Sequence, residues 1–544
     1  MKRNKIALSG LVLLGASSLV LAGCASGGGE TGGNEKPTGE ASTTAVISTN
    51  GSEPQNPLIP TSTNETGGGK IIDSIFAGLI SYEADGSTVN DVAEDITVDS
   101  PTQLTVKIKE GLTFTDGTPV LAHNFIDAWN YGAKLSNAQN ASYFFEDIEG
   151  FSWDEDSELT GLKEVDDLTF TITLNKPASD FALRLGYSAF YPLPDVAFED
   201  MEAFGQAPIG NGPYMLDGEG AWQHDVRIDL AVNPDYDGPR KPANGGLDIV
   251  FYATQEAAFA DLQSGNVDVI DVIPDSYLET FEDDLGGRAV NQPAAIFQSM
   301  NIPEWQEGFA TDEEGRLRRA AVSHAINREE ITDVIFKGTR TPATDFTSPV
   351  IDGWSDSVPG SDVLEYDPEL AKELWAEAEA IKPFTGELTI SYNADGGHQA
   401  WVDAVANSVS NTLGIDIAGN PFPDFASYLD ARDNQQVSAF RAGWQADYPG
   451  LYNFLGPLYA TGAGSNDGQY SSEEFDTLLS EGISATDPEE ATAKFQEAQT
   501  VLFTDLPALP LWYQNVVGGW AEGVDNVEFG WNSVPLFENI TKAE

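Results

Sequence analysis

Two charged residues in the carboxyl-terminal half, Arg441 and Asp447, could bind a ligand that carries one positive and one negative end. The alternating segment 437–441 is typical of a strand, and Pro449-Gly450 after it is typical of a turn. Because side chains alternate along a strand, an even separation places Arg441 and Asp447 on one face, up to ~20 Å apart. Small residues between them would let another backbone approach. A short zwitterionic peptide fits this pattern, with its amine at Asp447 and its carboxylate at Arg441.

The same segment also fits a purely structural interpretation. Asp447 could cap the turn before Pro449, and Arg441 could lie on a solvated edge. The types and spacing of these residues favour neither interpretation over the other.

The composition limits the class of ligand. The chain has 544 residues, enough for two or three domains, and a formal net charge of -60. A charge of this sign excludes nucleic acid and argues against a polyanionic substrate. Screening beyond ~10 Å makes the total charge weak evidence for a cationic ligand, so we interpret most of it as a solvated acidic shell.

The amino terminus predicts export and lipidation. Lys2, Arg3 and Lys5 precede the apolar run 6–21, which indicates a signal peptide over residues 1–23. The segment 21–24 resembles the bacterial lipobox, and its Cys24 is the only cysteine of the chain, so we expect Cys24 to carry the lipid. A transmembrane anchor is the alternative, but the run is short and no positive stop-transfer cluster follows it. The polar, glycine-rich residues 24–44 are expected to form a flexible tether.

The remaining chain alternates strands with helices. Strand patterns are predicted at 103–108, 169–174, 226–232, 248–252, 267–272 and 388–392, and helices at 70–80, 255–264, 398–413 and after the caps Asp367-Pro368 and Asp487-Pro488. The order of strand, helix and strand over 248–272 predicts a parallel pair with a right-handed crossover. The sequence therefore predicts an α/β protein.

Six motifs in order resemble one family, the bacterial extracellular solute-binding proteins of family 5, which are the oligopeptide- and dipeptide-binding components of ABC importers. No single motif carries the resemblance, but together the six span nearly the whole mature chain. They occupy residues 112–129, 210–214, 233–236, 265–269, 317–328 and 443–448.

The resemblance implies a two-lobed periplasmic-binding-protein-like fold (class II, cluster C) with an extra domain inserted in the first lobe. Residues 45–75, 194–291 and 516–544 would form lobe I, residues 76–193 the inserted domain, and residues 292–515 lobe II. The lobes of such proteins close on ligand like a hinged clamp.

The resemblance also implies a set of ligand-binding residues. Asp447 matches the aspartate that accepts the peptide amine, and Arg441 and His398 match residues that receive the carboxylates of some peptides. Gly443 and Gln445 would bond the ligand backbone as an added strand. Two further expected contacts are Trp444 and Glu65.

The expected function is capture of oligopeptides and their delivery to an ABC permease and its ATPase by a monomer, lipid-anchored on the extracytoplasmic face of the cell membrane, without cofactor, metal or enzymatic activity. One alternative keeps the scaffold but binds an oligosaccharide, stacked on Trp401 and Trp444, or a metal chelate. The four histidines are too scattered to suggest a metal cluster. A surface hydrolase is a further alternative, but neither G-x-S-x-G nor H-E-x-x-H occurs.

Overall fold

The computed structural model describes residues 44–63, 65–423 and 425–543. The predicted signal peptide, Cys24 and all of the tether before Thr44 lie outside the described residues. Within them the chain is a mixed α/β protein, as the sequence predicts. No helix in these ranges is long and apolar enough to cross a bilayer.

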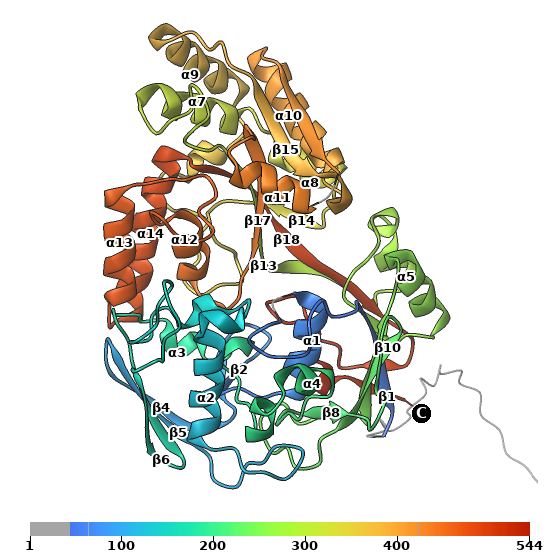
Figure 1. The fold of residues 1–544 in the computed structure, drawn as a ribbon. Coiled ribbons are helices and arrows are strands. Elements are labelled where there is room, and N and C mark those ends of the chain that lie inside the picture. The colour runs from blue at the N-terminus through green and yellow to red at the C-terminus, as the bar shows by residue number, and fades with distance from the viewer. Residues whose placement is uncertain (1–43, 64, 424, 544) are drawn as a thin grey trace, which may run out of the picture. The chain divides into compact units, whose positions relative to one another are not determined.

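One large sheet organises the molecule (Figure 1). Its strand order is β16-β15-β17-β13-β18-β12-β1-β11-β10-β8, with β14 beside β18 and β9 beside β10. The strands are β1 (Val46–Gly51), β8 (Tyr214–Leu216), β9 (Trp222–Gln223), β10 (Arg227–Val232), β11 (Gly246–Phe251), β12 (Val269–Ile270), β13 (Ala289–Asn301), β14 (Arg340–Pro342), β15 (Leu388–Asn393), β16 (Ile417–Phe422), β17 (Ala439–Gln445) and β18 (Ala508–Trp520).

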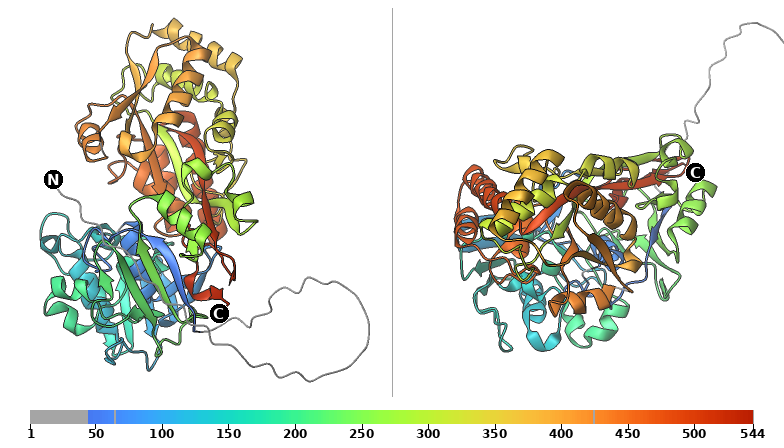
Figure 2. Two further views of the ribbon diagram at one scale, coloured as in Figure 1. Left: turned by 90° about the vertical axis from the view of Figure 1, so that its right-hand side faces the viewer. Right: turned by 90° about the horizontal axis from the view of Figure 1, so that it is seen from above.

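Two long strands, β13 and β18, join the two halves of this sheet. They pair antiparallel along almost their full length, and Figure 2 shows them side by side. Gln292 pairs with Val516, and the register shifts between Pro293 and Phe297. The predicted lobe boundaries, 291/292 and 515/516, fall at this paired position. The division into lobes and inserted domain stays a prediction.

The strands β11 and β12 are parallel to β1, which lies between them. The helix α5 (Gln255–Ser264) connects β11 to β12 and ends at Gly265, whose φ of +71° is the left-handed conformation favoured by glycine. The predicted parallel arrangement is therefore confirmed, although β1 separates the two strands.

A separate antiparallel sheet has the order β4-β5-β7-β6. Its strands are β4 (Ala93–Ser100), β5 (Gln103–Ile108), β6 (Leu162–Asp166) and β7 (Thr169–Thr173). The helix α2 (Ala122–Ala133) covers it through the buried Trp129, whose ring meets Phe170 edge-on at 5.7 Å. Two small two-stranded sheets pair β2 (Ile80–Tyr82) with β3 (Thr88–Asn90) and β19 (Val524–Asp525) with β20 (Thr541–Lys542).

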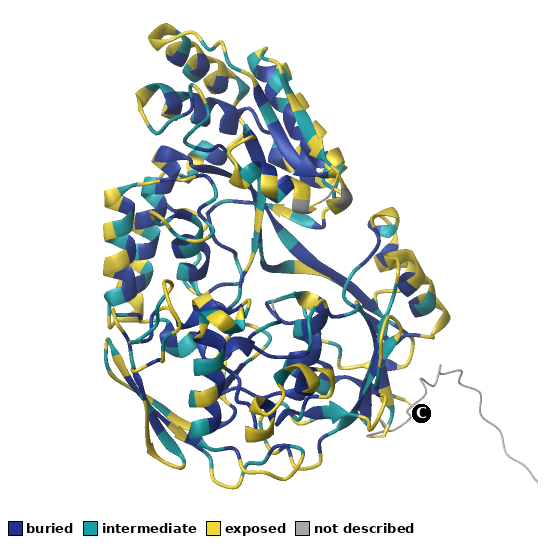
Figure 3. Cartoon of the chain, in the orientation of Figure 1, coloured by how far each residue is buried: buried dark blue, intermediate teal, exposed yellow. Residues whose placement is uncertain are grey.

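Helices bury one face and expose the other, and Figure 3 shows this on α13 (Glu473–Ser484) and α14 (Pro488–Asp505), which pack against each other. Asp367 and Asp487 cap α9 and α14 with proline at the first helical position, as predicted. The helices besides α2, α5, α13 and α14 are α1 (Thr66–Ile75), α3 (Phe181–Arg184), α4 (Met201–Gln206), α6 (Phe281–Asp284), α7 (Glu313–His324), α8 (Arg328–Val334), α9 (Pro368–Ile381), α10 (Gln399–Leu413), α11 (Phe425–Asp433) and α12 (Leu451–Tyr459).

Candidate functional site

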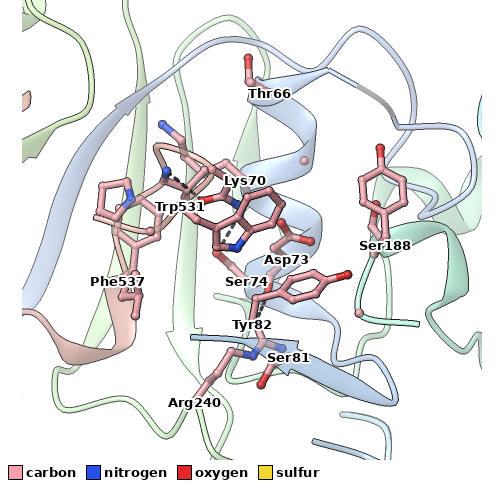
Figure 4. Close-up of a pocket in the computed structure, with 18 of the residues that line it drawn as sticks. Thr66, Lys70, Asp73, Ser74, Ser81, Tyr82, Ser188, Arg240, Trp531 and Phe537 are labelled. Carbon is pink, nitrogen blue, oxygen red and sulfur yellow. Dashed lines mark hydrogen bonds between the residues drawn. The ribbon is translucent and has the colours of Figure 1, made fainter. Parts of the chain in front are cut away.

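A cavity of about 270 Å³ lies between α1 and the end of β17. Figure 4 shows its α1 side. Its β17 side consists of Gln445, Ala446 and Asp447. Its α1 side is formed by residues of α1 and β2, by Tyr187 and Arg240, and by the carboxyl-terminal segment 530–538. Of the residues predicted to bind ligand, Asp447, Gln445 and Glu65 line this cavity.

Asp447 is held in place by the chain around it. The N–H of Ala446 donates to Ala295 O, 2.9 Å away, which fixes the end of β17 against the β13 strand. Asn453 on α12 accepts a hydrogen bond from the Asp447 N–H at 3.0 Å and donates its amide to Asp447 Oδ2 at 3.0 Å. Asp447 therefore does not cap the turn before Pro449, because its side chain bonds Asn453 instead.

The electrostatic environment of Asp447 disfavours its charge. Burial raises the pKa of Asp447 to about 6, although the hydrogen bond from Asn453 opposes the shift. Among the described residues, no arginine, lysine or histidine forms an ion pair with it. An ammonium group entering the cavity would supply the missing positive charge.

Aromatic rings line the α1 side of the cavity that Asp447 also lines. Burial, with the negative charges of Asp73 and Asp447, raises the pKa of Tyr82, and burial with the charge of Asp447 does the same for Tyr187. The Tyr82 ring meets Trp531 edge-on at 5.5 Å, and its hydroxyl donates to Leu183 O at 2.8 Å. The cavity thus combines a carboxylate with ring faces, which attract cations.

The edge of β17 beside Asp447 is open. The strand β15 pairs with β17 only at Ala439 and Phe440, so in the described ranges no strand covers residues 441–445 on the side away from β13. The N–H of Ala446 points towards β13, and main-chain groups of successive residues point to alternate sides of a strand. The N–H and C=O groups of Gly443 and Gln445 therefore point towards the open edge. Both residues are exposed.

Arg441 lies on the same strand but contacts other residues. Its Nε and Nη2 donate to Asn393 Oδ1 at 2.9 and 2.7 Å. Its guanidinium carbon lies 4.9 Å from the ring centre of Phe425 and 5.2 Å from that of Tyr428. Arg441 does not line the cavity, so the structure does not bring it together with Asp447.

The remaining predicted contacts have structural partners. Trp444 Nε1 donates to Asn453 Oδ1 at 2.9 Å, and Trp401 Nε1 donates to His398 Nδ1 at 3.1 Å. Trp401 is only 3% exposed, so it presents no face on which a sugar could stack. Glu65 lines the cavity, while both of its carboxylate oxygens accept the N–H of Gly68 at 2.9 Å at the start of α1.

Several cavity residues were missed by sequence analysis. Asp73 follows Thr66, Gly69 and Lys70 at helical spacing, so the cavity-facing side of α1 could have been recognised once α1 was known to line a site. Tyr82 and Trp531 carry no such signal, because they reach the cavity from segments about 450 residues apart.

The described residues contain no group of three or more histidine, cysteine, aspartate or glutamate side chains placed to hold a metal ion. His324 is buried, and its Nδ1 hydrogen-bonds Glu365 O at 2.8 Å. His123 and His224 each pair with one carboxylate, Asp195 and Glu53.

Comparison with known proteins places the cavity in context. Residues 87–466 match the family model of bacterial extracellular solute-binding proteins, family 5 Middle. The chain is 25% identical over 523 residues to the oligopeptide-binding protein OppA of Bacillus subtilis, covering 91% of this chain and 92% of the relative.

Two solved structures show the same fold. An unliganded open form of the murein tripeptide-binding protein MppA has a TM-score of 0.76 at 21% identity, covering 93% of this chain and 99% of that chain. The Haemophilus influenzae OppA in complex with RPPGFSPFR has a TM-score of 0.73 at 20% identity, covering 93% and 100%. The neighbours are periplasmic peptide-binding proteins, which are two-lobed.

Proposed function

Because the chain belongs to the bacterial extracellular solute-binding proteins of family 5, we propose that its cavity captures oligopeptides for an ABC importer by pairing Asp447 with the peptide's α-ammonium. The observation that carries this assignment is the carboxylate of Asp447, which lines the cavity without an ion-pair partner among the described residues. A buried charge of this kind is costly until an opposite charge joins it.

The peptide backbone would extend along the open edge of β17. Gly443 and Gln445 would exchange main-chain hydrogen bonds with it, as an added strand does. Main-chain hydrogen bonds do not depend on the identity of the peptide's side chains, so peptides of many sequences would bind. Arg441 lies outside the cavity, and it would contact the carboxylate of longer peptides together with His398, in addition to the partners that both residues already have.

The proposal also covers the cellular location of the protein and its attachment to the membrane. Family members are extracytoplasmic binding proteins. Cys24 would carry a lipid that holds the protein at the outer face of the membrane, close to its permease, and the protein would act as a monomer without catalysing a reaction. Mass spectrometry of the amino-terminal peptide after export tests the lipid, and incubation with peptides followed by a search for cleaved mass tests the absence of hydrolysis.

Native mass spectrometry of the purified protein tests the class of cargo. The expected result is co-purified or readily exchanged peptide. An oligosaccharide or a metal chelate in its place would overturn the proposal.

A further inference from the structure

The α1 side of the cavity carries more negative than positive charge. Arg240 is the basic residue at its floor, and all three donor nitrogens of Arg240 are already engaged. Nε donates to Asp91 Oδ2 at 3.2 Å, Nη1 to the main-chain oxygen of Asp73 at 2.6 Å, and Nη2 to that of Phe76 at 2.9 Å. The charge of Arg240 therefore compensates Asp91.

Lys70, the second basic residue of the cavity, is also already ion-paired. Lys70 Nζ donates to Asp271 Oδ2 at 2.6 Å and to Asn50 O at 2.9 Å. Neither Asp73 nor Glu538, which both line the cavity, has an ion pair within the described part of the chain. Asp73 Oδ1 accepts a hydrogen bond from the neutral hydroxyl of Tyr191 at 3.1 Å.

A buried hydroxyl at the same floor lacks a partner. Ser81 is 7% exposed and lines the cavity, and its Oγ has no hydrogen-bond partner among the residues described. Leaving a buried polar group unsatisfied costs about 1–3 kcal/mol, so a ligand group that donates to Ser81 would remove that cost. Figure 4 shows Ser81 on the strand that also carries Tyr82, beside Arg240.

The walls of the cavity carry aromatic rings. Tyr82 and Trp531 meet at 5.5 Å, and Tyr191 reaches Asp73 from a third segment. Aromatic faces attract arginine guanidinium and lysine ammonium groups. Burial raises the pKa of Asp73 and that of Glu538, in both cases against the opposing charge of Arg240. Burial therefore disfavours the charged form of both carboxylates.

We propose that the α1 side of the cavity is a subsite for a basic side chain, lysine or arginine, near the amino end of the bound peptide. The cation would lie among Asp73, Glu538 and Ser81 while Asp447 holds the α-ammonium. This inference rests on the proposed function and specifies which peptides the cavity prefers.

Calorimetric titration with matched peptides tests the subsite. The probes are Arg-Ala-Ala and Ala-Arg-Ala, each compared with the twin in which neutral citrulline replaces arginine. We expect at least one arginine peptide to bind about tenfold tighter than its twin, because the desolvated carboxylates favour the charged guanidinium. The preference should fall below about threefold in Asp73→Asn, which keeps an acceptor for Tyr191, and in Glu538→Gln.

Asp85→Asn is the control, because Asp85 is exposed and outside this cavity, and asparagine keeps an acceptor for the Ser87 N–H. Removing a solvated carboxylate there should change the preference less than about twofold. Equal binding of both arginine peptides and their twins would overturn the subsite. The subsite would also be overturned if free spermidine competed with the peptides for the cavity while neither arginine peptide bound tighter than its citrulline twin. If the citrulline peptides still bind and still need Asp447, the proposed function survives that failure.

Discussion

Asp447 and Arg441 lie six positions apart on one segment, yet the structure surrounds them differently. Asp447 lines a cavity, and burial without an ion pair among the described residues raises its pKa to about 6. Arg441 lies beside two aromatic rings, those of Phe425 and Tyr428, and donates to Asn393. The comparison teaches that a ligand-binding charge is recognised by the absence of a compensating charge in the folded protein. The spacing of two opposite charges in the sequence does not show whether either of them is compensated.

The largest difference should appear in peptide affinity. We expect Asp447→Ala to cost ~3–5 kcal/mol of binding free energy for a tripeptide, because the α-ammonium would be left without its counter-charge. Arg441→Ala should cost less than about 1 kcal/mol, since Arg441 is outside the cavity. Isothermal titration calorimetry measures both values.

A matched control for this pair is Asp467→Asn. Burial also raises the pKa of Asp467 to about 6, but Asp467 forms an ion pair with Arg432 at 2.7 Å outside the cavity. The affinity of the Asp467→Asn variant for the tripeptide should equal that of the unmodified protein. Equal losses at Asp447 and Asp467 would show a general destabilisation in place of a binding contact.

Peptide affinity should depend on pH through Asp447. Only the ionised carboxylate pairs with an ammonium group, and its pKa of about 6 in the free protein places the transition within reach of titration. Below pH 6 the affinity should fall by about tenfold for each pH unit. In Asp447→Asn the same pH series should be flat, and a persistent slope would assign the effect to another group.

The two residues should affect stability in opposite directions. Because folding raises the pKa of Asp447 above its unfolded value, the folded state binds the proton more tightly. This residue therefore lowers stability as pH rises from about 4 to about 6, and the loss stays constant at higher pH. Asp447→Asn should therefore raise the free energy of unfolding of the ligand-free protein at pH 8, by about 1 kcal/mol after solvent screening is allowed for.

Arg441→Ala should instead lower that free energy by about 1–2 kcal/mol, because it removes ring contacts and two hydrogen bonds to Asn393. Urea denaturation of both variants gives the comparison. A loss of stability in both variants would contradict the claim that the ionised Asp447 carboxylate destabilises the folded protein.

The smallest predicted effect concerns the open edge of β17. Methylating one backbone nitrogen of the peptide should cost about 0.5–1.5 kcal/mol at the position that donates to β17, since one main-chain hydrogen bond is lost. Gly443→Ala should leave the fold intact, because its Cβ would lie 3.5 Å from Phe297 O, an ordinary contact. A series of singly N-methylated peptides with uniform affinity would argue against strand addition.

Local patterns predicted much of the fold. The bounds of α5 and β5 match their sequence patterns, and the caps at Asp367 and Asp487 lie where the sequence places them. The strand predicted over 267–272 shortens to Val269–Ile270, because its pairing depends on β1 and β18, which are distant in sequence.

The site was less predictable. Asp447 could be selected from its neighbours, but the cavity also needs Tyr82 beside Trp531, and this contact exists only after the carboxyl terminus returns to the amino-terminal half. The separation of Arg441 from the cavity depends on Phe425 and Tyr428 of α11, which strand periodicity cannot show.

The most direct test of the central claim is a double-mutant cycle between Asp447 and the peptide's amino terminus. A tripeptide and its N-acetylated form would be titrated into the unmodified protein and into Asp447→Asn, with calorimetry at pH 8. Acetylation removes the ammonium charge, so we expect it to cost ~3–5 kcal/mol in the unmodified protein and less than about 1 kcal/mol in the variant. An acetylation cost that is the same in both proteins would contradict the pairing of Asp447 with the α-ammonium.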